Sequence, residues 1–551
     1  MSTKEKIIIA ILFIIPILRG LYFYHEAYFY GAVMTGILFF IIINNKKIYL
    51  DVSLRGLCLF FVTVLNFISI LYAIDYGMAF LESLKWLIIL ISYLVFIQLN
   101  INEMRNNIVK TIFYCGIILS LVGIISMFIP ELKQNVYFNN RLGSTIQYPN
   151  ALGVFLVVAL IWGISQEKLR RIDIIGSAII ISGVILTFSR SIYAILIGVL
   201  ILLMLYEREK TRKIIFIAML GILVGVILGS LGQVINTIDR VGDMTPNVSE
   251  FQSRLAYYED GIKLIMDKPM GIGGLGYKYS QKSFQTAVYS VKYIHNGFLQ
   301  IAIDNGIVAA MLVLVMFCDF FISGNNKFHE KLIVLIMVFH SLIDFDFEFP
   351  LFFIIIVLIF ALGKTKIKEY KAKFSVIVAL IVTFIYLYMF TATYFNYSGN
   401  YIKATLLYPY YTEARVNTLI EKEDGVKILE QNKYSVRAHQ FLVQHYDTNN
   451  NIAKKLYHMR QLMDIEHLEI KRVQDYSKAL LVEAKRCLAN EEYKKSQSYL
   501  QEILDLELYI KEQHKTISQR AYKLKHLPVM VMTPDLIEDN EEAKNMRRHL
   551  K

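Results

Sequence analysis

Two arginines and a histidine together have the chemistry to bind an anion and to accept a proton. Arg190 lies in TFSRSIYA, between two apolar stretches, and Arg254 begins the polar segment SRLAYYEDGIKLIMDKP. A guanidinium group offers a rigid fork of donors that fits phosphate oxygens. His295, in YIHNGFLQ, is the side-chain type that most often acts as a general base near neutral pH. Together they point to transfer chemistry at an anionic group.

Each of these residues also has a plainer interpretation. Arg190 could extend its guanidinium to a membrane surface, and Arg254 could be solvated at the start of a helix. A lone histidine such as His295 is more often hydrogen-bonded or solvated than catalytic. The residue types alone leave both interpretations open.

A histidine and a carboxylate recur in HSLIDFDFEFP, where His340 and Asp344 are four residues apart. On a helix this spacing places both side chains on one face. The pair could orient a helix end, or it could belong to an acceptor pocket. Asp239 and Asp243 are also close in sequence, but no group has clear metal-ligand spacing. We therefore predict no metal.

The run GIGGLG, residues 271–276, formally matches the dinucleotide fingerprint G-x-G-x-x-G. That fingerprint requires a preceding strand and a βαβ unit, and neither is indicated here. The run follows Pro269, so we expect a tight turn instead of a nucleotide site.

The elements that must position these residues are long apolar runs. The chain has 551 residues, 55% of them hydrophobic. Runs of roughly 17 to 23 apolar residues cross a bilayer core as helices. The sequence thus predicts an all-α, polytopic membrane protein of about 13 transmembrane helices, the first run being a span and not a signal peptide. The expected spans are 6–24, 27–43, 54–73, 80–98, 108–130, 149–165, 172–188, 190–206, 213–231, 297–322, 330–343, 350–363 and 374–395.

The net charge of +12 could suggest a nucleic-acid partner. In a membrane protein, however, Lys and Arg gather in the cytoplasmic connections between spans. Successive connections lie on opposite sides of the membrane, and here roughly 21 basic residues lie in the connections of one side and about 5 in those of the other. This bias predicts a multi-pass protein of the cytoplasmic membrane with a cytoplasmic N-terminus. The large loop, 231–297, and the C-terminus would be extracytoplasmic. We expect no nucleic acid to bind.

The character of the chain changes near residue 396. Residues 1–395 are expected to form the transmembrane domain, whereas 396–551 carry dispersed charge and no long apolar run. Segments such as VQDYSKALLVEAKRCLAN have Ala and Leu at helical spacing. We predict an extracytoplasmic domain of α-helical hairpins, weakly similar to tetratricopeptide repeats, which could bind a protein partner or an acceptor.

Five segments occur in an order that resembles the O-antigen ligase and polymerase superfamily, which includes bacterial protein O-oligosaccharyltransferases. The similarity covers roughly residues 130 to 365. It implies a metal-independent, cofactor-free, inverting glycosyltransferase of the GT-C type, which takes an oligosaccharide from a polyprenyl diphosphate outside the membrane. The segments are NNRLGSTIQYPNALGVFL, LTFSRSIYAILIGVL, SRLAYYEDGIKLIMDKPMGIGGLGYKY, YIHNGFLQIAIDNGIVAA and HSLIDFDFEFP.

The resemblance also implies roles for single residues. Arg190 and Arg254 match arginines that engage the donor diphosphate, and Arg141 matches a further outer arginine. His295 matches the histidine proposed to activate the acceptor hydroxyl. Residues with an expected positioning, acceptor or structural role are Tyr148, Pro149, Asn150, Asn296, His340 and Asp344.

The leading hypothesis is transfer or polymerisation of lipid-linked glycan in surface polysaccharide synthesis, with an unknown acceptor. Ligation to a protein or cell-wall acceptor is the alternative within the same chemistry. A polysaccharide transporter is a third hypothesis, and it would place charged residues inside the spans. Few charged residues occur in the apolar runs, which favours an enzyme.

Overall fold

The protein is nearly all helical, as the sequence predicts. Its structure is a computed structural model that describes residues 2–231, 249–323, 326–363, 365–420, 422–524 and 526–550. Asp239 and Asp243 lie outside the described residues. Within the described part, the strands form two short antiparallel pairs, β1 (Lys47–Asp51) with β4 (Ile367–Lys371) and β2 (Tyr137–Phe138) with β3 (Arg141–Leu142).

A helix is present at each of the thirteen predicted apolar runs. Six segments are long and apolar enough to cross a membrane: Tyr24–Asn45 (α2), Leu54–Tyr72 (α3 and η2), Tyr76–Leu99 (α4), Ile101–Ser126 (η3 and α5), Arg208–Leu231 (η5 and α10) and Lys373–Tyr397 (α18). The shorter apolar helices are α7 (Pro149–Ile164), α9 (Arg190–Tyr206), α15 (Ile307–Ile322) and α17 (Pro350–Leu362). The remaining runs form α1 (Thr3–Ile17), α8 (Arg171–Leu186) and α16 (Phe328–Ser341). The multi-pass character follows, while the count of thirteen crossings stays a prediction.

The predicted span 297–322 is in fact two helices, α14 (Gly297–Asn305) and α15, separated at Gly306. Gly306 has φ +89°, and a Cβ there would lie 2.7 Å from the carbonyl oxygen of Met270. The glycine-rich turn packs against this break, since Gly273 N donates to Asp304 O at 2.9 Å and Ile307 N donates to Pro269 O at 2.9 Å. The run 271–276 therefore forms a turn that fixes the angle between α14 and α15.

Helix α7 forms the buried centre of one half of the helical body. All sixteen of its residues are buried, because α5 (Arg105–Ser126), α8, α9 and α16 pack around it. Pro149 occupies its first turn, where the missing N–H costs no hydrogen bond. A helix enclosed on every side has little freedom to shift, so Tyr148 and Asn150 at its start are held in place.

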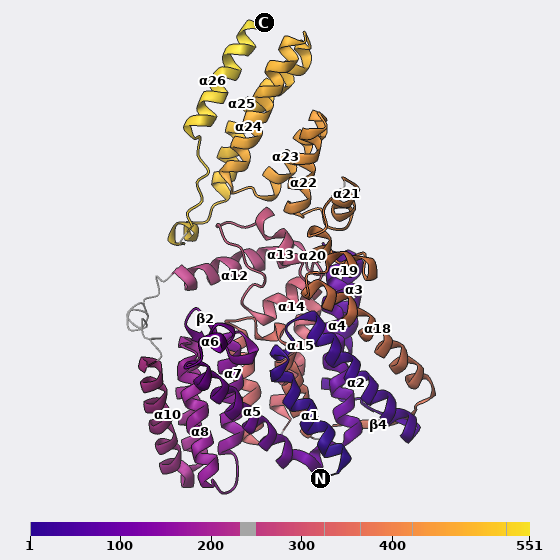
Figure 1. Ribbon diagram of the computed structural model, residues 1–551, viewed down its shortest axis with the longest axis vertical. Helices are drawn as coiled ribbons and strands as arrows, with labels where there is room; N and C mark the ends of the chain where they lie inside the picture. Colours follow the sequence, from indigo (N-terminus) through magenta and orange to yellow (C-terminus); the bar gives the residue numbers. More distant parts are fainter. Residues whose placement is uncertain are drawn as a thin grey trace.

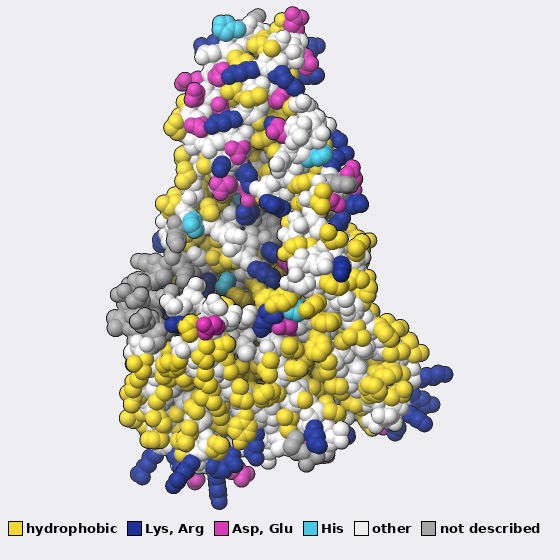
Figure 2. Space-filling view, in the orientation of Figure 1, with side chains coloured by type: hydrophobic (Ala, Val, Ile, Leu, Met, Phe, Trp, Pro, Cys, Tyr) yellow, Lys and Arg dark blue, Asp and Glu magenta, His cyan; other side chains and the backbone are white. Residues whose placement is uncertain are grey.

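The surface of this body is divided into an apolar belt and a charged end (Figure 2). Apolar side chains cover its sides, while Lys and Arg gather at the end that holds the N-terminus in Figure 1. This distribution agrees with the charge bias of the connections.

The later helices of the tail form a second packing unit above the body (Figure 1), whereas Ala404, Tyr408, Tyr411 and Ala414 belong to the core of the body. Helix α22 (Val436–Thr448) packs against α23 (Ile452–Ile465), and α24 (Ile470–Ala489) packs against α25 (Tyr493–Thr516). Its buried core includes Met463, Leu480 and Leu500. The other helices of the tail are α19 (Tyr401–Leu407), α20 (Thr412–Val416), α21 (Lys422–Gln431), η8 (Gln519–Lys523) and α26 (Pro534–His549). Similarity to tetratricopeptide repeats stays a prediction.

The long loop lies between the body and the tail. Its described part contains α12 (Ser249–Asp267), α13 (Gly276–Ser280) and η6 (Gln281–Ser283), and Figure 1 shows α12 across the top of the body. The side chain of Arg520, in the tail, donates to Glu259 at 2.6 Å and to Gln252 at 2.6 Å, both on α12. The tail is thus joined directly to the loop that carries Arg254.

Candidate active site

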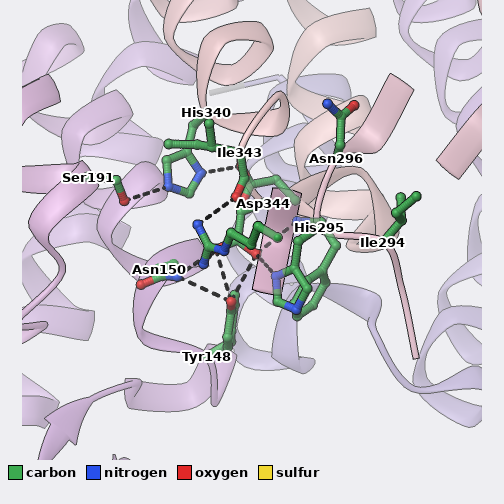
Figure 3. A network of polar contacts seen from close by, with 12 residues as sticks. Tyr148, Asn150, Ser191, Ile294, His295, Asn296, His340, Ile343 and Asp344 are labelled. Carbon is green, nitrogen blue, oxygen red and sulfur yellow. Dashed lines mark hydrogen bonds and ion pairs between the residues drawn. The ribbon is translucent and has the colours of Figure 1, made fainter. Parts of the chain in front are cut away.

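Asp344 is the centre of a polar network in the turn between α16 and α17 (Figure 3). Its side chain is only 1% exposed. It accepts hydrogen bonds from Tyr148 Oη at 2.9 Å, Asn150 Nδ2 at 2.5 Å and His295 Nδ1 at 3.1 Å. The Nη2 atom of Arg254 lies 3.9 Å from its Oδ2. One buried carboxylate therefore brings together residues from α7, α12 and the start of α14.

The carboxyl group of Asp344 is held in its ionised form. Burial alone would raise its pKa, but the hydrogen bond from His295 and the positive charges of His340 and Arg254 hold the pKa well below its usual range. A permanent negative charge at this position favours a proton on the nearest nitrogen of His295.

His295 has a backbone conformation that the surroundings must impose. Its φ is +56°, a region that residues other than glycine seldom adopt and that costs about 1–3 kcal/mol. Tyr258 Oη donates to His295 O at 2.7 Å, and Ile294 N donates to Gln300 Oε1 at 2.9 Å. These bonds on both sides aim the imidazole at Asp344.

The contact with Asp344 determines which nitrogen of His295 can act as a base. Because Nδ1 donates its proton to the carboxylate, Nε2 carries the lone pair. The imidazole is 22% exposed and lies edge-on to Phe345 at 4.9 Å between ring centroids. It can therefore meet a substrate while its orientation is fixed.

Asn296 caps helix α14. Its Oδ1 accepts from Phe298 N at 3.1 Å and Leu299 N at 3.0 Å, which satisfies two N–H groups at the helix start. Its Nδ2 donates to Leu342 O at 2.9 Å. Asn296 thus joins the loop end to the turn after α16, while a role with the acceptor stays a prediction.

Arg254 and Tyr258 project from α12 toward the same turn. Arg254 Nη1 donates to Ile343 O at 2.8 Å, and its side chain is 29% exposed. A guanidinium has five N–H donors, so these contacts leave donors for an anion. The exposed, cationic edge of the network is therefore at Arg254.

Arg141 joins the network through Asn150. Its Nη2 donates to Asn150 Oδ1 at 2.6 Å and its Nε donates to Thr187 O at 2.9 Å. Arg190 is exposed in the first turn of α9. It is next to Ser191, whose Oγ lies 3.1 Å from Nε2 of His340. That Arg190 and Arg254 share one anion stays a prediction.

The expected pairing of His340 with Asp344 is wrong. His340 pairs through Nδ1 with Asp346, whereas Asp344 pairs with His295. Helix α16 ends at Ser341, so the four-residue helical spacing does not extend to Asp344. The His340 side chain is 0% exposed and lies on the buried side of the turn.

A second buried charged group, not predicted from the sequence, lies in and around α4. Lys85 Nζ is 3.3 Å from Glu82 Oε2 and donates to Glu348 O at 3.2 Å, while Tyr24 Oη donates to Glu82 at 2.5 Å. Burial raises the pKa of Glu348 to about 7. The spacing of Glu82 and Lys85 within one apolar run was the available signal.

The geometry supplies a base, a group that orients it and a neighbouring cation. Among the residues described, no three His, Cys, Asp or Glu side chains gather to hold a metal ion. The prediction that no metal is needed is not tested by this. What the arrangement can do is remove a proton at Nε2 of His295 beside a site that favours negative charge.

The comparisons with known proteins give one family match. A family model described as O-antigen ligase matches residues 175–314. The match includes Arg190, Arg254 and His295, while Asp344 follows it in the sequence. Neither the curated proteins nor the solved structures give a significant match. Over residues 175–314, the chain is therefore similar to the O-antigen ligase family.

Proposed function

We propose that the protein transfers or polymerises a glycan carried on a polyprenyl diphosphate, at the outer face of the cytoplasmic membrane. The match to the O-antigen ligase family supports ligation or polymerisation of surface glycan. The observation that carries the finer proposal is the His295–Asp344 pair with Arg254 beside it. This set joins a proton acceptor to an anion-binding cation.

The reaction follows from these positions. Nε2 of His295 accepts the proton of an acceptor hydroxyl, and the oxygen forms a bond to the anomeric carbon of the donor sugar. The bond between that carbon and the diphosphate oxygen breaks, and polyprenyl diphosphate leaves with the electron pair. Asp344 stabilises the imidazolium, and Arg254 offsets the charge on the departing diphosphate. A single displacement of this kind inverts the anomeric centre and requires no metal.

The orientation of the chain follows from the charge bias. With the basic end of the body in the cytoplasm, the network around Asp344 and the tail lie outside. An alkaline phosphatase fusion after residue 396 should therefore be active, because that enzyme folds only outside the cytoplasm. A matched fusion after Lys210, in a basic connection, should be inactive. An inactive fusion at 396 would contradict the orientation.

Arg254→Ala should lower the transfer rate by about 10²–10³-fold, since removing one preorganised donor to developing negative charge has effects of this size. The transfer rate of Arg254→Lys should lie between those of Arg254→Ala and the wild type, because lysine keeps the positive charge but lacks the planar fork of N–H donors. Arg437→Ala, at an exposed position on α22, is the matched control and should leave the rate unchanged.

The assay uses purified protein in liposomes, a chelator, and lipid-linked oligosaccharide extracted from cells that lack this gene. Release of polyprenyl diphosphate gives the rate, and the product gives the reaction type. A ladder of repeats indicates a polymerase, whereas a single addition to a protein or wall fragment indicates a ligase. Full activity of Arg254→Ala would rule out the assigned role of this arginine.

A further inference from the structure

A cavity lies between the long loop and the tail, beside the network around Asp344. Its volume is about 500 Å³, within the range of about 300–1,000 Å³ that is common for ligand sites. Ser253, Tyr257 and Gln285 form its loop side, while Glu466 and Leu524 are part of its tail side. In Figure 2 a recess opens between the apolar body and the tail, with basic and histidine side chains visible in it.

Two joints between loop and tail frame this cavity. At one edge, Arg520 donates to Glu259 at 2.6 Å. At the other, Lys282 Nζ lies 2.6 Å from Glu466 Oε1, and Glu466 is itself buried. The cavity is therefore a built feature of the folded protein, and the tail supplies one of its walls.

The same helix serves both the cavity and the proposed base. Ser253 and Tyr257 are one turn apart on α12 and line the cavity. Arg254 and Tyr258 form the next stripe and contact the turn and loop that hold Asp344 and His295. The ring centroid of Tyr257 is 6.2 Å from that of His295. A ligand in the cavity would lie one side chain away from the imidazole.

The lining suits a polyhydroxylated ligand more than a diphosphate. Tyr257 and Tyr289 present aromatic surface, with ring centroids 4.5 Å apart, and Gln285 adds a neutral amide. Glu466 and Glu469 are carboxylates, which accept hydrogen bonds from hydroxyl groups. The exposed carboxylate of Glu469 also disfavours phosphate, and Glu466 holds the charges of Lys282 and Arg472 in ion pairs. These are features of a site for uncharged or amino sugars.

We propose that this cavity binds the acceptor glycan, holding the sugar units behind the hydroxyl that His295 deprotonates. The proposal rests on the proposed function, because it assigns a substrate to the same centre. It also gives the tail a role, since Glu466, Glu469 and Leu524 come from it. The donor diphosphate would remain on the side of Arg254 and Arg141.

The test measures binding apart from transfer. The probe is the oligosaccharide released by mild acid from the extracted lipid-linked donor and labelled at its reducing end, titrated against full-length protein in nanodiscs. Ser290 lines the cavity and is exposed, so Ser290→Trp obstructs the space without altering a packed core. We expect its Kd to rise about tenfold or more. Ser498→Trp, at an exposed position on α25, is the matched control and should keep the wild-type Kd.

A second variant, Glu469→Lys, changes charge without bulk at an exposed lining position and should also raise the Kd. His295→Gln should bind the probe normally while it fails to transfer, which separates this inference from the proposed function. Equal Kd values for Ser290→Trp and wild type, or no binding of the probe by wild type, would overturn the inference. Full transfer by His295→Gln would instead overturn the proposed chemistry and leave the binding result standing.

Discussion

Replacing His295 by alanine should lower the rate of glycan transfer by about 10²–10⁴-fold, the usual contribution of a positioned general base. The expected loss is large because Nε2 is the nitrogen that the contact with Asp344 leaves with a lone pair. Water could still remove the proton, but with neither the orientation nor the buried carboxylate behind it. Rates are measured from release of polyprenyl diphosphate under saturating donor.

Two further variants separate chemistry from folding. His295→Gln keeps a hydrogen-bond donor toward Asp344 but offers no basic nitrogen, so its rate should fall as far as that of alanine while its Tm stays close to wild type. His445→Ala replaces a half-buried histidine of α22 that is remote from the network, and it should retain full activity. A glutamine variant with more than a tenth of the wild-type rate would exclude proton transfer to His295.

Asp344→Asn should be at least as damaging, with a loss of about 10³–10⁴-fold. The amide would offer N–H groups to His295 Nδ1, which favours the tautomer with the proton on Nε2. The base would then be present but in the wrong form. The amide also faces donors from Tyr148 and Asn150, so we expect a loss of about 1–3 kcal/mol in stability.

Asp346→Asn is the matched comparison for this variant. Asp346 is buried in the same turn and pairs with His340 instead of His295. Its replacement should lower the Tm to a similar extent and reduce transfer far less than Asp344→Asn. The double variant His295→Ala, Asp344→Asn should be no slower than His295→Ala alone, because the two residues act as one unit. If the rate losses of the two single variants multiplied in the double variant, the two residues would not act as one unit.

The positions of the apolar helices could be predicted because their apolar runs are long and separated by charged connections. The break at Gly306 could not be predicted from hydrophobicity, since residues on both sides are apolar and only one short polar segment interrupts them. The pair Asn305–Gly306 was the local signal, being a common turn dipeptide. The turn at 271–276 that supports the break comes from a distant part of the sequence.

Which residues belong to the site could be predicted better than which residues each of them contacts. The charge bias predicts one outer side for Arg141, Arg190, Arg254, His295 and Asp344. The structure joins four of them, Arg141, Arg254, His295 and Asp344, in one network. The partner of His340 differs from the expected one because α16 ends at Ser341, before Asp344. Contacts such as Tyr148 with Asp344 link residues nearly 200 positions apart, and no local pattern encodes them.

The joint between Arg520 and α12 has a consequence for the order in which the protein matures. The ribosome makes the loop with Arg254 and His295 long before it makes residue 520, which follows α18 and most of the tail. Until then Glu259 and Gln252 lack the guanidinium that later binds them. In the proposed orientation, the loop with Arg254 and His295 therefore reaches the outer surface before the tail that joins it. The cavity between loop and tail closes only late in synthesis.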